Sequence, residues 1–255
     1  MQRIQHNGLA WYTFDGPDRC FHHALITRQG GVSQPPFAGL NLGHSVGDAA
    51  DAVGENHRRL FAALGVSAGQ VVSPHQVHGR QVARVTIEDG GKVIPETDGL
   101  ISNTPELALL LRFADCTPVL FYDPEHRAAG LAHAGWRGVA CGVIPATVQA
   151  MTDAFGTQPS HLWAGVGPAI GPDHYEVGSD VIEAIQANTP LISTRQDDRW
   201  FLDMPAVVEA QLRELGIANV EQARMCTACN TAEWYSHRQE KGRTGRFGVL
   251  VRLAP

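Results

Sequence analysis

The longest apolar pattern in the chain covers Leu107–Val139 and predicts three consecutive strands. Leu107–Phe113 and Pro118–Tyr122 are continuous apolar runs, and Ala128–Ala132 follows a turn at Asp123–His126. Polar side chains that could bind a metal interrupt this apolar stretch at the ends of the strands. We therefore expect the rest of the chain to be organised around these strands, with a functional site at their ends.

Helices are predicted where periodic apolar positions lie between a capping residue and a glycine. Pro145 fits a helix only if it lies in the first turn. The predicted helices are Ala49–Leu64 with Asp48 as N-cap and Gly65 as stop, Gly142–Phe155, a helix from a Ser179 cap to Ala187, and a helix from an Asp203 cap to Leu215.

Further strands are predicted on both sides of these helices. Val71–Val77 and Gln81–Ile87 suggest a pair of strands around a turn that contains His78. The other predicted strands are Phe21–Thr27, His161–Val166, Val220–Met225, Ala232–Ser236 and Phe247–Leu253. Because hairpins alternate with helical connections, the pattern favours an α+β fold with mixed sheets. No repeat or linker divides the sequence, so residues 1–255 are expected to form a single domain.

Composition and charge narrow the range of partners. A net charge of −6 gives no basic footprint for nucleic acid, and no apolar window is long enough to span a membrane. The N-terminal sequence has no apolar core of an export signal. The expected location is therefore the cytoplasm, where the five cysteines would be reduced thiols.

Three residues are candidate metal ligands because each lies at a predicted junction between a strand and a turn: His78, Cys116 and His133. Two imidazoles and one thiolate suit zinc and leave a fourth position for water. The spacing alone equally allows Cys116 to be a buried small hydrophobic residue and the histidines to be structural. His75 is the alternative to His78, which we prefer because it adjoins the turn at Gly79.

Other polar residues could bind substrate or transfer protons. Asp98 and Asp115 are the carboxylates that we expect to do proton work. A lone Cys226-x-x-Cys229 pair has no second pair to complete a zinc site, so we interpret it as a tight turn. Guanidinium groups beside exposed backbone amides favour phosphate or carboxylate. The arginines beside glycines are Arg28, Arg137, Arg243 and Arg246, of which Arg28 and Arg137 are the candidates for binding phosphate.

The strings TRQGGVS, LNLG, QVHG, ADCTPVLF, AHAGWRG, GPAIGP and CTACN…SHR…TGR occur in this order. Together they closely resemble the YfiH-like laccase-domain family, whose members have been named polyphenol oxidase, peptidoglycan editing factor and purine nucleoside phosphorylase. The resemblance runs from about Ala24 to Leu250. It implies a single-domain sandwich of mixed β-sheets flanked by helices, and a zinc site at His78, Cys116 and His133.

The same resemblance implies an activity. The expected reactions are phosphorolysis of adenosine, inosine and S-methyl-5'-thioadenosine, with adenosine deamination at the same site. The partners would be a small nucleoside and phosphate, in a monomer or weak homo-oligomer. Copper is a less favoured alternative to zinc, because a multicopper oxidase needs paired HxH ligands and the chain has none. A familiar zinc deaminase would show HxE followed by PCxxC, whereas His78 has no such glutamate and Cys226 does not follow a proline.

Two other classes of function use the same residues. In a cysteine amidase that acts on a peptidoglycan precursor, Cys116 would be the nucleophile and His133 its base. A zinc-binding module without catalysis is the third hypothesis, and the absence of a fourth protein ligand counts against it. Alkylation of Cys116 separates the first two, because a metal-bound thiolate resists alkylation until the metal is removed.

Overall fold

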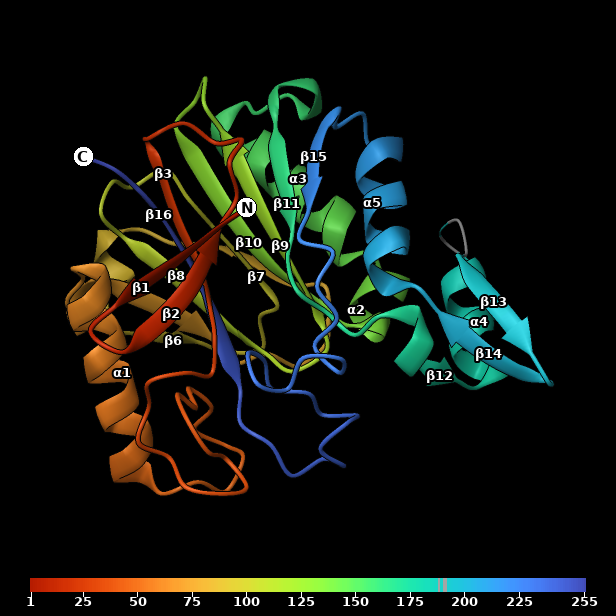
Figure 1. Ribbon diagram of the computed structural model, residues 1–255. Helices are drawn as coiled ribbons and strands as arrows, with labels where there is room; N and C mark the ends of the chain where they lie inside the picture. The colour runs from red at the N-terminus through yellow and green to blue at the C-terminus, as the bar shows by residue number, and fades with distance from the viewer. Residues whose placement is uncertain (188, 190–191) are drawn as a thin grey trace.

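Two mixed β-sheets form the centre of the molecule in the computed structural model, which describes residues 1–187, 189 and 192–255 (Figure 1). The seven-stranded sheet has the order β1 (Gln2–His6), β2 (Leu9–Thr13), β3 (Phe21–Ile26), β16 (Phe247–Leu253), β8 (Ala108–Phe113), β4 (Val71–Pro74), β6 (Val93–Ile94). The six-stranded sheet has the order β15 (Asn219–Gln222), β11 (Trp163–Val166), β9 (Thr117–Asp123), β10 (Ala128–Ala134), β7 (Gly99–Ser102), β5 (Val82–Arg84). Both sheets combine parallel and antiparallel pairs, which confirms the expected α+β class with mixed sheets.

The two sheets pack face to face, and the strands at their centre are apolar on both sides. In β8, Leu109 and Leu111 point into the cluster between the sheets, whereas Leu110 points to the outer face. In β9, Leu120 belongs to the inner cluster and Phe121 to the opposite face. Burial on both faces explains why the sequence of these strands is continuously apolar instead of alternating.

Helices cover both outer faces of the sandwich (Figure 1). Helix α1 (Ala50–Leu64) packs on the seven-stranded sheet through Leu60. Helices α3 (Val143–Phe155) and α5 (Met204–Glu214) pack on the six-stranded sheet, close to the short helix α2 (Trp136–Ala140). At the side of the molecule, α4 (Ser179–Gln186) packs on a three-stranded sheet of β12 (Glu176–Val177), β14 (Arg199–Leu202) and β13 (Ser193–Gln196).

The helix ends agree only partly with the capping signals. Asp203 caps α5 by accepting a hydrogen bond from the Ala206 amide, as predicted. The prediction for Asp48 is wrong, because the N-cap of α1 is Ala49 and the Asp48 carboxylate accepts bonds from Ser33 and Asn41 instead. The predicted Ser179 cap is also wrong, since Gly178 is the N-cap and Ser179 is the first helical residue.

The chain passes several times from one sheet to the other, which the sequence did not predict. The expected pairing of Val71–Val77 with Gln81–Ile87 is wrong, because β4 lies in the seven-stranded sheet and β5 in the six-stranded sheet. The chain crosses again between β8 and β9, with Cys116 in the link. Ligand candidates therefore lie where the chain passes between the sheets.

Several shorter elements also differ from the prediction. The segment Ala232–Ser236 is not a strand but a series of turns that buries Trp234 and Tyr235. Helix α2, the N-terminal β1–β2 hairpin and the three-stranded sheet were not predicted. Among the described residues, we find no helix with both the length and the apolar character needed to cross a lipid bilayer.

Candidate metal centre

The structure brings His78, Cys116 and His133 to one point. One ligand atom from each of the three side chains lies within 4.8 Å of the other two. The two imidazole rings meet edge to face, with their centroids 4.8 Å apart. His78 lies in the link between β4 and β5, Cys116 directly precedes β9, and His133 lies near the end of β10.

The backbone of His78 is held in a conformation that non-glycine residues seldom adopt. Its φ is +60°, in the left-handed region, which costs on the order of 1 kcal/mol. Both carboxylate oxygens of Asp98 compensate by accepting hydrogen bonds from the amides of Val77 (3.1 Å), His78 (3.0 Å) and Gly79 (2.7 Å). Asp98 thus fixes the turn that presents the exposed His78 side chain.

Asp98 also orients the second histidine. The Nδ1 of His133 lies 2.8 Å from Asp98 Oδ1, and the two side chains are buried. With Nδ1–H donated to the carboxylate, Nε2 is the ring nitrogen left to bind a metal. Burial alone would raise the pKa of Asp98, but the bonds from His133 and the Gly79 amide outweigh it and leave this pKa below its usual value. Asp98 is therefore an ionised support for both histidines.

Cys116 and His133 shift each other's pKa in the directions that favour a thiolate and an imidazolium. Burial by itself would raise the pKa of Cys116, but the charge and hydrogen bond of His133 lower it to about 6. Burial would lower the pKa of His133, and the Cys116 thiolate raises it instead to about 9. A thiolate is the form of cysteine that binds metals, so the site is prepared for a cation before the cation arrives.

Alkylation of Cys116 is expected to depend on pH in a way that reports this ion pair. Since the pKa of Cys116 is lowered to about 6, its thiolate predominates above that pH and is lost as the pH falls through it. In metal-free protein, the rate of iodoacetamide labelling at Cys116, followed by peptide mass spectrometry, should reach half its plateau near pH 6 and not near 9. A midpoint near 9 would contradict the ion pair.

Gly135 closes the space around the proposed ligands. A Cβ atom at this position would lie 3.0 Å from Cys116 Sγ and 3.1 Å from His78 Cδ2. The backbone of Gly135 is extended, with φ −74°, so any residue could adopt its conformation. A side chain at position 135 is therefore excluded by the Cys116 sulfur and the His78 imidazole, which need this space if they bind an ion.

Replacing Gly135 by alanine should weaken metal binding because the new methyl group pushes Cys116 and His78 apart. We expect a loss of about 10- to 100-fold in zinc affinity, the range found for changes that displace metal ligands. Competition with a chromogenic chelator measures this affinity. Gly54→Ala in α1 is the control, because its Cβ would meet nothing within 4 Å, and it should leave the affinity unchanged. Equal affinities of the two variants would refute the steric argument.

Asp115, which the sequence suggested for proton transfer, lies beside the centre and is engaged in the fold. Its φ of +84° is also left-handed, and it directly precedes Cys116. Its Oδ1 accepts from the Thr227 hydroxyl at 2.6 Å, and its Oδ2 accepts from the Arg238 amide at 2.7 Å. These bonds tie the Cys116 link to the C-terminal segment of the chain.

The two arginines proposed for phosphate differ in how they are engaged. The Arg28 guanidinium donates to the carbonyls of Ala38 and Thr231, pairs with Glu240 at 2.9 Å and stacks on the ring of Tyr235. Arg137 is exposed, and its guanidinium stacks 4.2 Å above the ring of Trp136. Among the described residues, the Arg28 guanidinium donates its N–H groups to protein acceptors, whereas the N–H groups of the exposed Arg137 guanidinium can donate to a ligand.

Two further residues lie close to the centre, Tyr175, which the sequence did not single out, and Arg246, which it did not assign to phosphate. Burial raises the pKa of Tyr175, and the negative charge of Cys116 acts in the same direction. Burial lowers the pKa of Arg246, against the opposing charges of Cys116 and Asp115. Arg246 could have been found from the sequence, because it is one of the arginines beside glycines. No local sequence pattern indicates Tyr175.

Comparisons with known proteins agree with this architecture. Residues 22–254 match a family model described as multi-copper polyphenol oxidoreductase laccase. The chain is 36% identical over 241 residues to purine nucleoside phosphorylase YlmD of Geobacillus stearothermophilus, covering 89% of this chain and 88% of that one. It is 38% identical over 250 residues to purine nucleoside phosphorylase PA4543 of Pseudomonas aeruginosa, covering 96% and 98%.

A solved structure supports the same relationship. The crystal structure of YlmD from Geobacillus stearothermophilus superposes with a TM-score of 0.94 at 32% identity, covering 99% of this chain and 98% of that chain. The sandwich expected from the sequence motifs is thereby confirmed, together with the resemblance on which it was based.

Proposed function

We propose that this chain, which belongs to the family described as multi-copper polyphenol oxidoreductase laccase, is a zinc-dependent purine nucleoside phosphorylase. The observation that carries the proposal is the convergence of His78, Cys116 and His133 within 4.8 Å, in a chain whose similar relatives are named purine nucleoside phosphorylases. A thiolate and two imidazoles are a donor set that suits zinc. A zinc ion held by them would act as a Lewis acid toward an oxygen of the substrate.

The proposed reaction places an anion next to a nucleoside. A phosphate oxygen forms a bond to the anomeric carbon of the ribose, and the bond from that carbon to the purine nitrogen breaks. We assign the binding of phosphate to Arg137, whose exposed guanidinium can donate two parallel hydrogen bonds. Arg28 is the less favoured candidate because its donors bind Ala38, Thr231 and Glu240.

The remaining proposed residues support or surround the substrate. Asp98 would act by positioning His78 and His133, and Asp115 by fixing the link that carries Cys116. We propose adenosine, inosine and S-methyl-5'-thioadenosine as substrates, with deamination of adenosine as a second activity. We expect the enzyme to act in the cytoplasm, because thiols such as that of Cys116 are kept reduced there.

Product analysis with and without phosphate tests the proposal. Protein of measured zinc content is incubated with adenosine, and the products are separated by chromatography. With phosphate, adenine and ribose 1-phosphate should appear in equal amounts; without phosphate, inosine from deamination should be the main product. Absence of any phosphate-dependent release of base, with all three nucleosides, would reject the phosphorylase.

A cysteine amidase remains the second candidate, because the Cys116–His133 ion pair would also suit a nucleophile and its base. Such an enzyme would act on a peptidoglycan precursor and keep its activity in a chelator. Iodoacetamide distinguishes the two functions. Rapid labelling of Cys116 in the protein as purified favours the amidase, whereas labelling only after removal of zinc favours the phosphorylase.

A copper-dependent polyphenol oxidase is the third possibility, suggested by the description of the family model. The chain lacks the HxH pairs that bridge copper ions in multicopper oxidases. Protein loaded with copper should therefore not oxidise a phenol at a rate that depends on Cys116. Such a rate, measured by oxygen uptake, would favour the oxidase over the phosphorylase.

A further inference from the structure

A second group of metal-binding side chains lies outside the proposed zinc centre. One ligand atom from each of His174, Cys226 and Cys229 lies within 4.8 Å of the other two. The sequence pattern of Cys226-x-x-Cys229 was interpreted as a tight turn, and the structure does place a turn there. His174 completes the group, although it lies 52 residues before Cys226 and no sequence pattern connects the two.

The local backbone presents the three side chains to one another. Pro172–His174 form a single 3₁₀ turn, and a β-bridge between Ala169 and Cys226 fixes this segment against the cysteine turn. The sulfur of Cys226 accepts hydrogen bonds from the amides of Gly171 at 3.2 Å and Cys229 at 3.4 Å. Backbone amides directed at a cysteine sulfur stabilise its thiolate form, as they do at iron–sulfur and zinc sites.

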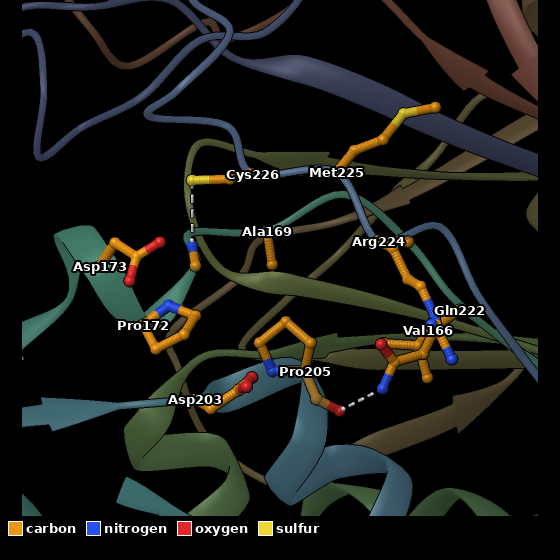
Figure 2. A pocket seen from close by; sticks show the side chains of 12 residues that line it. Val166, Ala169, Pro172, Asp173, Asp203, Pro205, Gln222, Arg224, Met225 and Cys226 are labelled. Atoms are coloured by element: carbon orange, nitrogen blue, oxygen red, sulfur yellow. Dashed lines mark hydrogen bonds between the residues drawn. The ribbon is translucent and has the colours of Figure 1, made fainter. Parts of the chain in front are cut away.

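The group is also accessible. Cys226 and His174 are partly buried, and Cys229 is exposed. Cys226 and Asp173 line a cavity of about 350 Å³ beside the N-terminus of α5 (Figure 2). The dashed line at the Cys226 sulfur in Figure 2 marks the hydrogen bond that this sulfur accepts from the Gly171 amide. An ion can therefore reach the cluster from solvent.

We propose that His174, Cys226 and Cys229 form a second metal site that binds a borderline-soft divalent ion, zinc in particular. Two thiolates and one imidazole are a common donor set for zinc, and water would fill the fourth position. The ring nitrogen Nε2 of His174 lies 3.1 Å from Cys229 Sγ, a contact that an ion inserted between them would replace.

This second site would position residues of the first centre without touching the substrate. Thr227 follows Cys226 and donates its hydroxyl hydrogen to Asp115, the residue before Cys116. Tyr175 follows His174 and lies close enough to Cys116 for the thiolate charge to affect its pKa. A metal that joins the two segments would fix both neighbours, so its loss should alter substrate affinity more than zinc binding at Cys116.

Metal analysis of single variants tests the proposal independently of any phosphorylase activity. After growth and purification with zinc and a reductant, the wild-type protein should contain about two zinc ions per chain by plasma mass spectrometry. Cys116→Ala and Cys229→Ser should each contain about one, and the double variant none. Cys141→Ser is the matched control, because Cys141 is also exposed and its thiol donates to the Gly138 carbonyl, outside both groups of proposed ligands.

Cobalt spectroscopy identifies the ligands. In Cys116→Ala loaded with cobalt, absorption from thiolate to metal should persist, and adding Cys229→Ser or His174→Ala should weaken or remove it. Circular dichroism establishes that each variant is folded; if Cys229→Ser does not fold, the His174→Ala comparison decides.

Two results would overturn the second site. The first is a folded Cys229→Ser or His174→Ala protein with the wild-type metal content. The second is a Cys226–Cys229 disulfide in protein purified with reductant, detected as a peptide two hydrogens lighter, because a disulfide leaves no thiolates for the ion.

Discussion

Replacing Cys116 by alanine is expected to remove zinc from the first centre and to lower phosphorolysis by about 1,000-fold or more. Loss of the metal removes several kcal/mol of transition-state stabilisation, and each 1.36 kcal/mol corresponds to a factor of ten in rate. The variant also removes the thiolate that raises the pKa of His133. The pKa of the buried imidazole should then fall, although Asp98 still raises it, and only two ligands remain, neither of them an anion.

The measurement combines steady-state kinetics with adenosine and phosphate and metal analysis of the same sample. Cys141→Ser serves as the control for the loss of a thiol and should keep full activity, since Cys141 lies outside the proposed centre. Thermal unfolding shows whether the alanine variant is folded. A folded Cys116→Ala protein that turns over adenosine at the wild-type rate without metal would refute the proposed function.

The central strands could be predicted from sequence because they are buried on both faces. Leu109 and Leu110 face opposite sides of β8, so no polar residue interrupts the run. The same property hides the pairing of strands. An apolar run gives no indication of which sheet receives it, and the segment around His78 therefore looked like a hairpin although it crosses between sheets.

Of the caps predicted at Asp48, Ser179 and Asp203, only that of Asp203 is correct. Asp203 is free to accept from the Ala206 amide and does so. Asp48 has the right residue type but lies one residue before the N-cap Ala49, and Ser33 and Asn41 donate to one of its oxygens. Contacts between residues far apart in sequence thus override a local signal, and no capping rule applied to the sequence contains them.

The candidate ligands were identifiable by residue type and motif, whereas the residues that support them were not. Asp98 was expected to act on protons or substrate, and the structure surrounds it with three amides and an imidazole. His174 had no feature that would connect it with Cys226, because the two segments meet only through the fold. Residue type suggests which chemistry is available, and the three-dimensional arrangement decides which residues take part.

Changing Asp98 to asparagine is expected to lower zinc affinity by about 10- to 100-fold and to destabilise the protein. Outer partners of metal-binding histidines typically contribute this much to affinity. Oδ2 of Asp98 accepts from the amides of Val77 and Gly79, and Oδ1 accepts from His78 and His133. The amide group of asparagine has one oxygen, so either pair of donors would face an NH2 group.

Each buried donor left without an acceptor costs about 1–3 kcal/mol, so the free energy of unfolding should fall by at least about 2 kcal/mol. The left-handed turn at His78 would lose an acceptor as well, which displaces the metal-binding imidazole. Zinc affinity is measured by chelator competition, and stability of the metal-free protein by denaturant unfolding. The two readouts separate damage to the site from damage to the fold.

Asp123 provides a matched control, because it lies at the end of β9 that is opposite Cys116. Asp123 is also fully buried, accepts hydrogen bonds from the amides of Glu125 and His126, and pairs with the His126 ring at 2.9 Å. Asp123→Asn should therefore lose a similar amount of stability while keeping the wild-type zinc affinity. Both variants lose one carboxylate oxygen beside a histidine, so their zinc affinities can be compared directly. A similar loss of zinc affinity in the two variants would show that Asp98 acts only through the stability of the fold. A loss in Asp98→Asn alone would establish Asp98 as the residue that positions the two histidines.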